Sequence, residues 1–239
     1  MAGHSHWSKI KRAKGSNDAK RGKVWSKIAR KIIIAAKGGG GDPGQNLSLR
    51  YVIDEAKQAN MPKDTIANAI KKGTGELGAE DYEAITYEGY GPGGVAIMIE
   101  ALTNNRARTA PDLRAAFERH GGNLGSNGSV AFQFTKSGVI TLNAGGVDED
   151  DLMESALEAG AEDVRNEGEV FEVVTQPTAF HKVKDALAAR DFTIENAEVT
   201  YLPQNTVAVD GEKAQTLLKL IDLLEDNDDV QTVSHNGEL

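Results

Sequence analysis

Apolar residues recur at helical spacing near the amino terminus of the chain. Over residues 17–36 they fall on one side of a helix with about 3.6 residues per turn. The members of this apolar side are Val24, Trp25, Ile28, Ala29, Ile32, Ala35 and Ala36. A helix with one apolar and one polar side is typical of a surface helix that packs against a domain, so we predict a helix here.

Two further helices follow a glycine-rich loop at residues 38–44. Helical spacing predicts one helix over residues 46–59 and another from Pro62 to Gly73. Proline suits the first turn of a helix and glycine suits its carboxyl end, so the third helix has the expected residue at each end. The sequence therefore predicts a helical domain over residues 1–75.

The pattern changes to alternating strands and helices after this domain. Residues 84–88 and 95–103 are expected to form strands, joined by the glycine-rich turn of residues 89–94. Thr109 is expected to cap the next helix, because an acidic residue three positions later would complete a capping box. Another strand is predicted over residues 129–134.

A strand–helix–strand–strand–helix–strand series comes next. Its strands are predicted over residues 138–142, 162–165, 170–174 and 192–202, and its helices over residues 148–159 and 178–189. A last strand, helix and strand are predicted over residues 206–209, 212–224 and 230–234.

These elements predict an α+β fold: a three-helix domain followed by two ferredoxin-like domains, one inserted in the other. The discontinuous domain would cover residues 80–135 plus 204–239. The inserted βαββαβ domain would cover residues 136–203.

Length and composition limit the classes of protein that remain. The chain has 239 residues, which favours two or three domains. It contains no cysteine, which excludes disulfides, thiolate zinc sites and cysteine nucleophiles. No run approaches the roughly 18 apolar residues of a membrane-spanning helix. We therefore predict a cytoplasmic protein with no membrane partner.

Charge divides the chain into a basic front and an acidic remainder. Residues 1–72 hold sixteen Lys or Arg against five Asp or Glu, a net of +11, whereas residues 73–239 hold eleven against thirty-one, a net of −20. A basic segment attracts a polyanion and an acidic one is repelled by phosphate. The helical end is therefore expected to face nucleic acid, either DNA or ribosomal RNA and tRNA.

Basic residues also gather on the polar side of the first predicted helix. Those on an arc of roughly 100° are Lys20, Lys23, Lys27, Arg30 and Lys31. Those in the preceding segment are Lys9, Lys11, Arg12 and Lys14. We predict that these nine residues contact phosphate. His4 and Trp7 are expected to stack on or hydrogen-bond to bases, although Trp7 would alternatively anchor the tail to its own domain.

A basic amphipathic segment is also compatible with three less favoured roles. An ordinary solvated surface helix is disfavoured, because the first 37 residues hold eleven bases and one acid. Binding to anionic lipid is disfavoured by an apolar side that is rich in alanine and has one aromatic residue. A mitochondrial targeting peptide is disfavoured because lysine outnumbers arginine eight to three in this segment.

The remaining motifs give no catalytic or cofactor site. The glycine-rich residues 89–94 lie between two predicted strands instead of opening a helix, so they do not form a dinucleotide fingerprint. His4 and His6 lack further ligands at the spacing of a metal site, and no Ser/His/Asp arrangement can be recognised. We predict a protein that is not an enzyme and that has no cofactor, metal or small-molecule substrate.

Charged residues outside the helical domain have several interpretations. Arg106 and Arg108 either make secondary contacts with phosphate or balance nearby acids. The acidic run at residues 148–151 is interpreted as charge at a helix amino terminus, and the run at residues 225–229 as a solvated turn.

Three stretches together resemble the YebC family of bacterial regulators. The opening MAGHSHW resembles the family's MAGHSKW start. Residues 41–43 and 55–76 resemble its second signature, and residues 87–134 resemble its long central block. The resemblance extends over essentially the whole chain. The chain departs from the family's usual residues at His6, Asn104 and Ala107.

The resemblance implies a cytoplasmic protein with a helical amino-terminal domain and two α+β domains. Family members are regarded as probable transcriptional regulators that bind DNA. Others, including a mitochondrial relative that activates translation of a cytochrome oxidase subunit, act at the ribosome and relieve stalling at proline-rich stretches. We therefore predict a DNA-binding transcriptional regulator. The alternative is a ribosome-associated translation factor that binds ribosomal RNA or tRNA.

Overall fold

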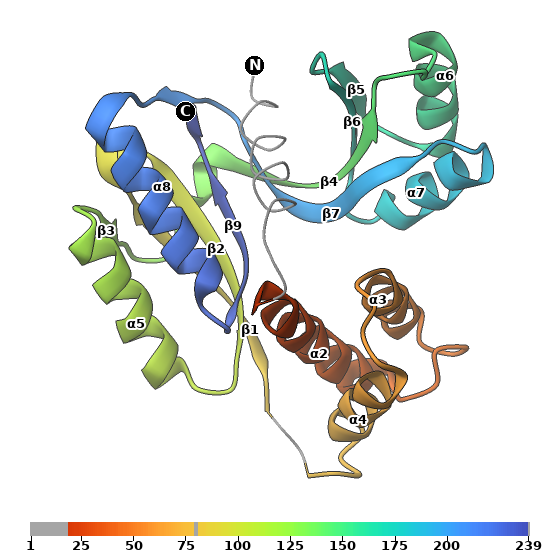
Figure 1. The fold of residues 1–239 in the computed structure, drawn as a ribbon, viewed down its shortest axis with the longest axis horizontal. Helices are drawn as coiled ribbons and strands as arrows, with labels where there is room; N and C mark the ends of the chain where they lie inside the picture. The colour runs from red at the N-terminus through yellow and green to blue at the C-terminus, as the bar shows by residue number, and fades with distance from the viewer. Residues whose placement is uncertain (1–18, 79–80, 239) are drawn as a thin grey trace.

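The computed structural model describes residues 19–78 and 81–238. The first three helices of this described part pack together in the lower right of Figure 1. They are α2 Ala19–Gly39, α3 Leu47–Gln58 and α4 Lys63–Gly73. Their facing sides bury Ile28, Ile32, Leu49 and Ile66, and Trp25 packs against this core. The apolar side predicted for the first helix is therefore the side that packs.

Asn46 fixes the connection between α2 and α3. Its side-chain oxygen accepts a hydrogen bond from the Leu49 backbone N–H (3.0 Å), and its amide donates to the carbonyls of Ala35 and Gly40 (2.8 Å each). Helix α2 runs three residues beyond its predicted end and stops where Gly40 adopts φ +84°. Glycine tolerates this left-handed conformation without steric cost, so the helix can end there.

The first sheet is antiparallel, with the strand order β3-β1-β2-β9. Its strands are β1 Glu83–Tyr90, β2 Ala96–Thr103, β3 Asn123–Leu124 and β9 Val230–His235. Helices α5 Arg106–Arg119 and α8 Gly211–Asp226 cover one face of it, as Figure 1 shows. Ile97 and Ile99, two residues apart on β2, pack there with Phe117, Leu217 and Leu220.

The second sheet is also antiparallel and has the order β5-β6-β4-β7. Its strands are β4 Phe134–Asn143, β5 Asp163–Asn166, β6 Val170–Thr175 and β7 Ile194–Pro203. Helices α6 Glu149–Ala159 and α7 Phe180–Ala189 lie together on one side of it (Figure 1). This order, with helices between the first and second and the third and fourth strands, is ferredoxin-like. The predicted α+β fold class is confirmed.

The first sheet reaches the same spatial arrangement through different connections. Its central strand β1 leads directly into β2 by a hairpin that contains a short 3-10 helix, η1 Pro92–Gly94. The strand predicted over residues 206–209 is not part of this sheet. Instead β8 Val207–Ala208 pairs in parallel with β10 Gly237–Glu238. The division of the chain into residues 1–75, 80–135 plus 204–239, and 136–203 remains our proposal.

The strand predicted over residues 129–134 was wrong. A short 3-10 helix, η2 Ala131–Gln133, occupies half of it, and β4 begins at Phe134. The carboxylate of Glu88 accepts hydrogen bonds from three backbone N–H groups nearby, those of Gly128 (2.7 Å), Val130 (2.8 Å) and Ala131 (2.9 Å). These amides bind a side chain, so they do not pair with a neighbouring strand.

The cap predicted at Thr109 was also wrong. Helix α5 begins three residues earlier, at Arg106, and the side chain of Asn105 accepts the hydrogen bond from the Arg108 backbone N–H (3.1 Å). Asparagine is among the preferred capping residues, and here it precedes the threonine. Thr109 is buried inside the helix, where its hydroxyl donates a hydrogen bond to the carboxylate of Asp229.

Glu172 lies in the middle of β6 with its side chain fully buried. Neither of its carboxylate oxygens has a hydrogen-bond partner among the described residues. Burial disfavours the charged form, and the charge of Glu167 adds to this effect while Arg165 opposes it, so the pKa of Glu172 is raised to about 8. The carboxyl group is therefore largely protonated in the folded protein at pH 7.

Replacing Glu172 by Gln should stabilise the protein increasingly as the pH rises. Between the ordinary pKa of 4.5 and the folded value of about 8, the unfolded chain releases a proton that the folded chain keeps, so the parent protein loses stability with rising pH. The variant lacks this loss, so its stability relative to the parent should rise by about 4–5 kcal/mol across this pH range. Urea unfolding across this pH range measures it. A difference that stays constant with pH would contradict the assignment.

Candidate nucleic-acid interface

The polar side of α2 carries those predicted phosphate contacts whose side chains the structure describes. Lys23, Lys27 and Arg30 are four and three residues apart, so they lie on one face of the helix, with Lys31 beside them. The opposite face is held in the helical core by buried residues such as Ile32. Packing therefore fixes the direction in which the basic face points.

This basic face contacts an acidic segment at the carboxyl end of α8. We call residues 225–229, which form the end of α8 and the loop into β9, the acidic tip. Lys23 Nζ forms an ion pair with Asp226 Oδ1 at 2.9 Å, and Lys27 Nζ donates to the Glu225 carbonyl at 2.7 Å. Lys23 and Asp226 are 203 residues apart in the sequence. The fold thus brings the most basic segment against an acidic one.

Helix polarity explains why lysines bind at the acidic tip. The last carbonyl groups of a helix lack partners within the helix and carry partial negative charge. The last turn of α8 contains no basic residue of its own. The lysines of α2 therefore supply the positive charge that the end of α8 lacks.

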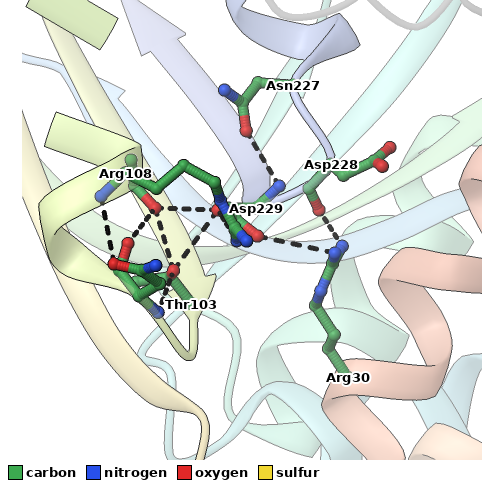
Figure 2. Close-up of polar contacts among 8 residues, drawn as sticks. Arg30, Thr103, Arg108, Asn227, Asp228 and Asp229 are labelled. Atoms are coloured by element: carbon green, nitrogen blue, oxygen red, sulfur yellow. Dashed lines mark hydrogen bonds and ion pairs between the residues drawn. The ribbon is translucent and has the colours of Figure 1, made fainter. Parts of the chain in front are cut away.

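Arg30 extends the contact to Asp229, which lies at the centre of the polar cluster in Figure 2. The Arg30 guanidinium donates to the Asp228 carbonyl and lies 3.4 Å from Asp229 Oδ1. The other oxygen, Oδ2, accepts hydrogen bonds from Arg108 (2.7 Å), Thr109 (2.7 Å) and Thr103 (3.3 Å). The carboxylate of Asp229, whose side chain is 4% exposed, therefore joins α2 to α5 and β2.

The environment of Asp229 keeps its carboxylate charged. Burial alone would raise its pKa, but hydrogen bonds from Arg108 and Thr109 and the positive charges of Arg108 and Arg30 outweigh burial and lower the pKa below its ordinary value of 3.8. The same hydrogen bond and charge raise the pKa of Arg108. At neutral pH the cluster is a carboxylate between two guanidinium groups.

The two arginines predicted as secondary contacts differ in their surroundings. Arg108 balances a nearby acid, Asp229, which is one of its two predicted interpretations. Arg106 lies 3.7 Å from Glu83, and its side chain is 65% exposed. Both remain predictions as phosphate contacts, and the exposure of Arg106 leaves more of its surface open to a ligand.

The acidic run at residues 225–229 was predicted to be a solvated turn. Residues 228–229 do form a turn, and Asp226 and Asp228 are exposed, but the prediction was wrong for Asp229. Asp229 is 3% exposed, because Arg30 and Arg108 approach it from both sides. Sequence reasoning also missed Thr103 as a partner of this carboxylate. The only signal that the sequence offers is the coexistence of a strongly basic segment and a strongly acidic run, which does not say that they pair.

A second contact joins the helical domain to α7. The rings of Tyr51 on α3 and His181 on α7 stack with their centroids 3.4 Å apart and their planes 2° apart. Burial lowers the pKa of His181, and the charge of Lys184 acts in the same direction. The imidazole is therefore mainly neutral at pH 7, which suits stacking on an uncharged ring.

The remaining predicted contacts are Lys31, whose side chain the structure describes, and several residues whose side chains it does not describe. Lys31 forms an ion pair with Glu55 at 2.8 Å, and Lys20 lies in α2 without a described side chain. The other predicted residues fall outside the described residues and stay predictions: His4, Trp7, Lys9, Lys11, Arg12 and Lys14.

The described residues offer no evident metal centre. Within residues 19–78 and 81–238, no three His, Asp or Glu residues come together in a group that would bind a metal ion. No helix in this part of the chain is both long and apolar enough to cross a membrane.

Comparison with protein families covers almost the whole chain. Residues 5–76 match the model of the TACO1/YebC protein N-terminal domain. Residues 82–237 match the model of the TACO1/YebC second and third domain. The chain belongs to the TACO1/YebC family.

Similar proteins of this family have nearly the same length. A probable transcriptional regulatory protein from Acidithiobacillus ferrooxidans is 54% identical over 239 residues, which cover 100% of this chain and 95% of that protein. One from Syntrophotalea carbinolica is also 54% identical, with coverages of 100% and 96%. The crystal structure of a conserved hypothetical protein from Aquifex aeolicus matches with a TM-score of 0.84 and 47% identity, covering 92% of this chain and 91% of that one. The family predicted from the sequence is confirmed.

Replacing Asp229 by Asn should destabilise the protein by about 2–4 kcal/mol at neutral pH, because two guanidinium groups would lose their shared carboxylate. Urea unfolding followed by circular dichroism measures this. Because the folded pKa of Asp229 is lowered, its contribution is present above pH 3.8 and is lost as the pH falls further. The deficit of the variant should therefore shrink in acid.

The neighbouring Asp228 provides the matched control. It binds Arg30 through its backbone carbonyl, and its carboxylate points away from Arg30 in Figure 2. Asp228→Asn removes the same charge one residue away and should cost less than about 0.5 kcal/mol. Equal losses for the two variants would show that Asp229 is not a special link.

Proposed function

We propose that this chain is a regulator of transcription that binds DNA through its helical domain and has no catalytic activity of its own. The observation that carries this proposal is the division of charge, with a net of +11 in residues 1–72 and −20 in the remainder. Electrostatic attraction to phosphate supplies most of the affinity of sequence-independent binding. The acidic remainder would turn the helical domain toward the polyanion.

The geometry of α2 supports this proposal. Its apolar side is used in the helical core, so its cations are held on the other side of a rigid element. An α-helix rises about 1.5 Å per residue, so Lys23, Lys27 and Arg30 lie on successive turns of α2. Each turn can therefore present one cation to a different phosphate. The names of the curated relatives, probable transcriptional regulatory proteins, agree with this class of function.

Phosphate recognition alone also fits the alternative, a translation factor that binds ribosomal RNA or tRNA. Two experiments on cell extract separate them. A transcriptional regulator should enrich discrete promoter fragments over bulk DNA. A translation factor should sediment with ribosomes and leave them after nuclease treatment. Sedimentation with ribosomes and no promoter enrichment would replace DNA by ribosomal RNA in the proposal.

Neutralising three lysines of the basic face should reduce the salt dependence of DNA binding. In the triple variant with Lys23→Gln, Lys27→Gln and Lys31→Gln, the slope of log K against log[salt] should decrease in magnitude by about 2 to 3. Each neutralised phosphate contributes about 0.9 to this slope. Titration of a labelled DNA duplex at several salt concentrations measures this slope. Arg30 is left intact because it contacts Asp229.

The helical domain offers a control with the same change in net charge. Lys57, Lys63 and Lys71 are exposed on α3 and α4. Their replacement by Gln should change the slope much less. The same reduction in both variants, or none in either, would contradict the assignment of α2 as the phosphate-binding element.

A further inference from the structure

The described cations of the proposed phosphate-binding face already contact carboxylate or carbonyl oxygens of the same chain. Lys23 binds the Asp226 carboxylate, Lys27 binds the Glu225 carbonyl and Arg30 reaches Asp229. The acidic tip thus presents carboxylate and carbonyl oxygens where a nucleic acid would present phosphate oxygens. A cation that donates to one of these oxygens is not available to phosphate in the same geometry.

The contact between the helical domain and the rest of the chain is mainly polar where the structure describes it. Among the described residues, the apolar core of α2, α3 and α4 receives only Tyr82 from beyond the helical domain. Further contacts include the ion pairs at the tip, the stacked pair Tyr51–His181 and an exposed ion pair between Lys37 and Asp81 at 2.5 Å. A polyanion can compete with contacts of this kind, whereas it cannot compete with a shared apolar core.

The segment after α4 gives the helical domain a place to turn. Residues 74–77 form turns and Gly78 lies in neither a helix nor a strand; Gly75 has φ +86° and Gly78 has φ +85°. Glycine changes its backbone angles at low cost, so a rotation of the helical domain can be taken up here.

We propose that the acidic tip is an internal competitor of nucleic acid: the structure shows a closed state, and phosphate displaces the tip from α2 in an open state. This inference rests on the proposed function and names its regulation. Because only the open state binds, the apparent dissociation constant equals the intrinsic one divided by the open fraction. Weakening the tip should therefore tighten binding without adding any contact to DNA.

The test is a tip variant, Asp226→Asn with Asp228→Asn, in the full chain. Both residues are exposed, and neither carboxylate contacts Asp229, so the fold should persist. Its dissociation constant for a labelled DNA duplex should fall about 3- to 10-fold, as expected for the loss of the Lys23–Asp226 ion pair and of one further surface charge near the basic helix. The slope of log K against log[salt] should not become shallower, because the bound state makes the same phosphate contacts and salt no longer has to weaken the Lys23–Asp226 ion pair.

The matched control removes two acids far from α2. Asp150→Asn with Asp151→Asn changes the net charge equally, and both residues are exposed in the first turn of α6. This variant should bind like the parent. An equal gain in both variants would reduce the effect to net charge and overturn the inference.

A distance measurement tests the opening itself. The chain has no cysteine, so Leu47→Cys on α3 and Lys219→Cys on α8, both at exposed positions, can carry two spin labels without further changes. Saturating DNA should lengthen the mean distance between the two labels or broaden the distribution of distances. The tip variant should show part of this change without DNA. An unchanged distance at saturation would overturn the inference.

The outcomes separate the inference from the proposed function. If the parent protein binds DNA and the tip variant gains nothing, the inference fails and the proposed function stands. If neither the parent nor any variant binds DNA or RNA, the proposed function itself fails. If the tip variant binds more tightly and loses this gain when Lys23 and Lys27 are replaced by Gln, both are supported.

Discussion

The carboxylate of Asp229 is the interaction on which the arrangement of this molecule depends. It is buried at the point where β9 begins. It accepts hydrogen bonds from β2 and α5 and forms an ion pair with Arg30 of α2. A buried carboxylate is costly unless it is paired and hydrogen-bonded, and this one is both. The position of α2 relative to the first sheet is therefore set by an electrostatic contact, whereas each sheet is held to its own helices by an apolar core.

The contrast between apolar contacts within each part and charged contacts between the parts has a functional consequence. Apolar cores hold the helical domain and each sheet together internally, because Ile32, Leu217 and Leu152 are fully buried in three separate clusters. Charged groups join the helical domain to the first sheet. Salt and polyanions weaken charged contacts and leave apolar cores intact, so a nucleic acid can alter how the parts are joined without unfolding them. The basic residues of α2 can then serve two anionic partners in turn.

The sequence predicted the elements well where the pattern is local. Helical spacing located α2, and Pro62 and Gly73 marked both ends of α4, because these signals depend on a few neighbouring residues. It failed where a distant group decided the outcome. Glu88 draws the amides of residues 128–131 out of the predicted strand. Asp229 binds Thr109, which local reasoning had assigned to a cap.

The candidate site shows the same limit. The charge of α2 and the family were readable from the residues, and the comparisons support the family. That the basic face contacts residues 225–229 was not readable, because the contact joins segments about 200 residues apart and no local pattern encodes it.

Hydrogen–deuterium exchange of the intact chain, with and without a saturating DNA duplex, tests the central claim most directly. We expect slower exchange in α2 and faster exchange in the acidic tip when DNA is bound, because phosphate would replace the tip on Lys23 and Lys27. Protection confined to the two sheets, with α2 and the tip unchanged, would contradict it.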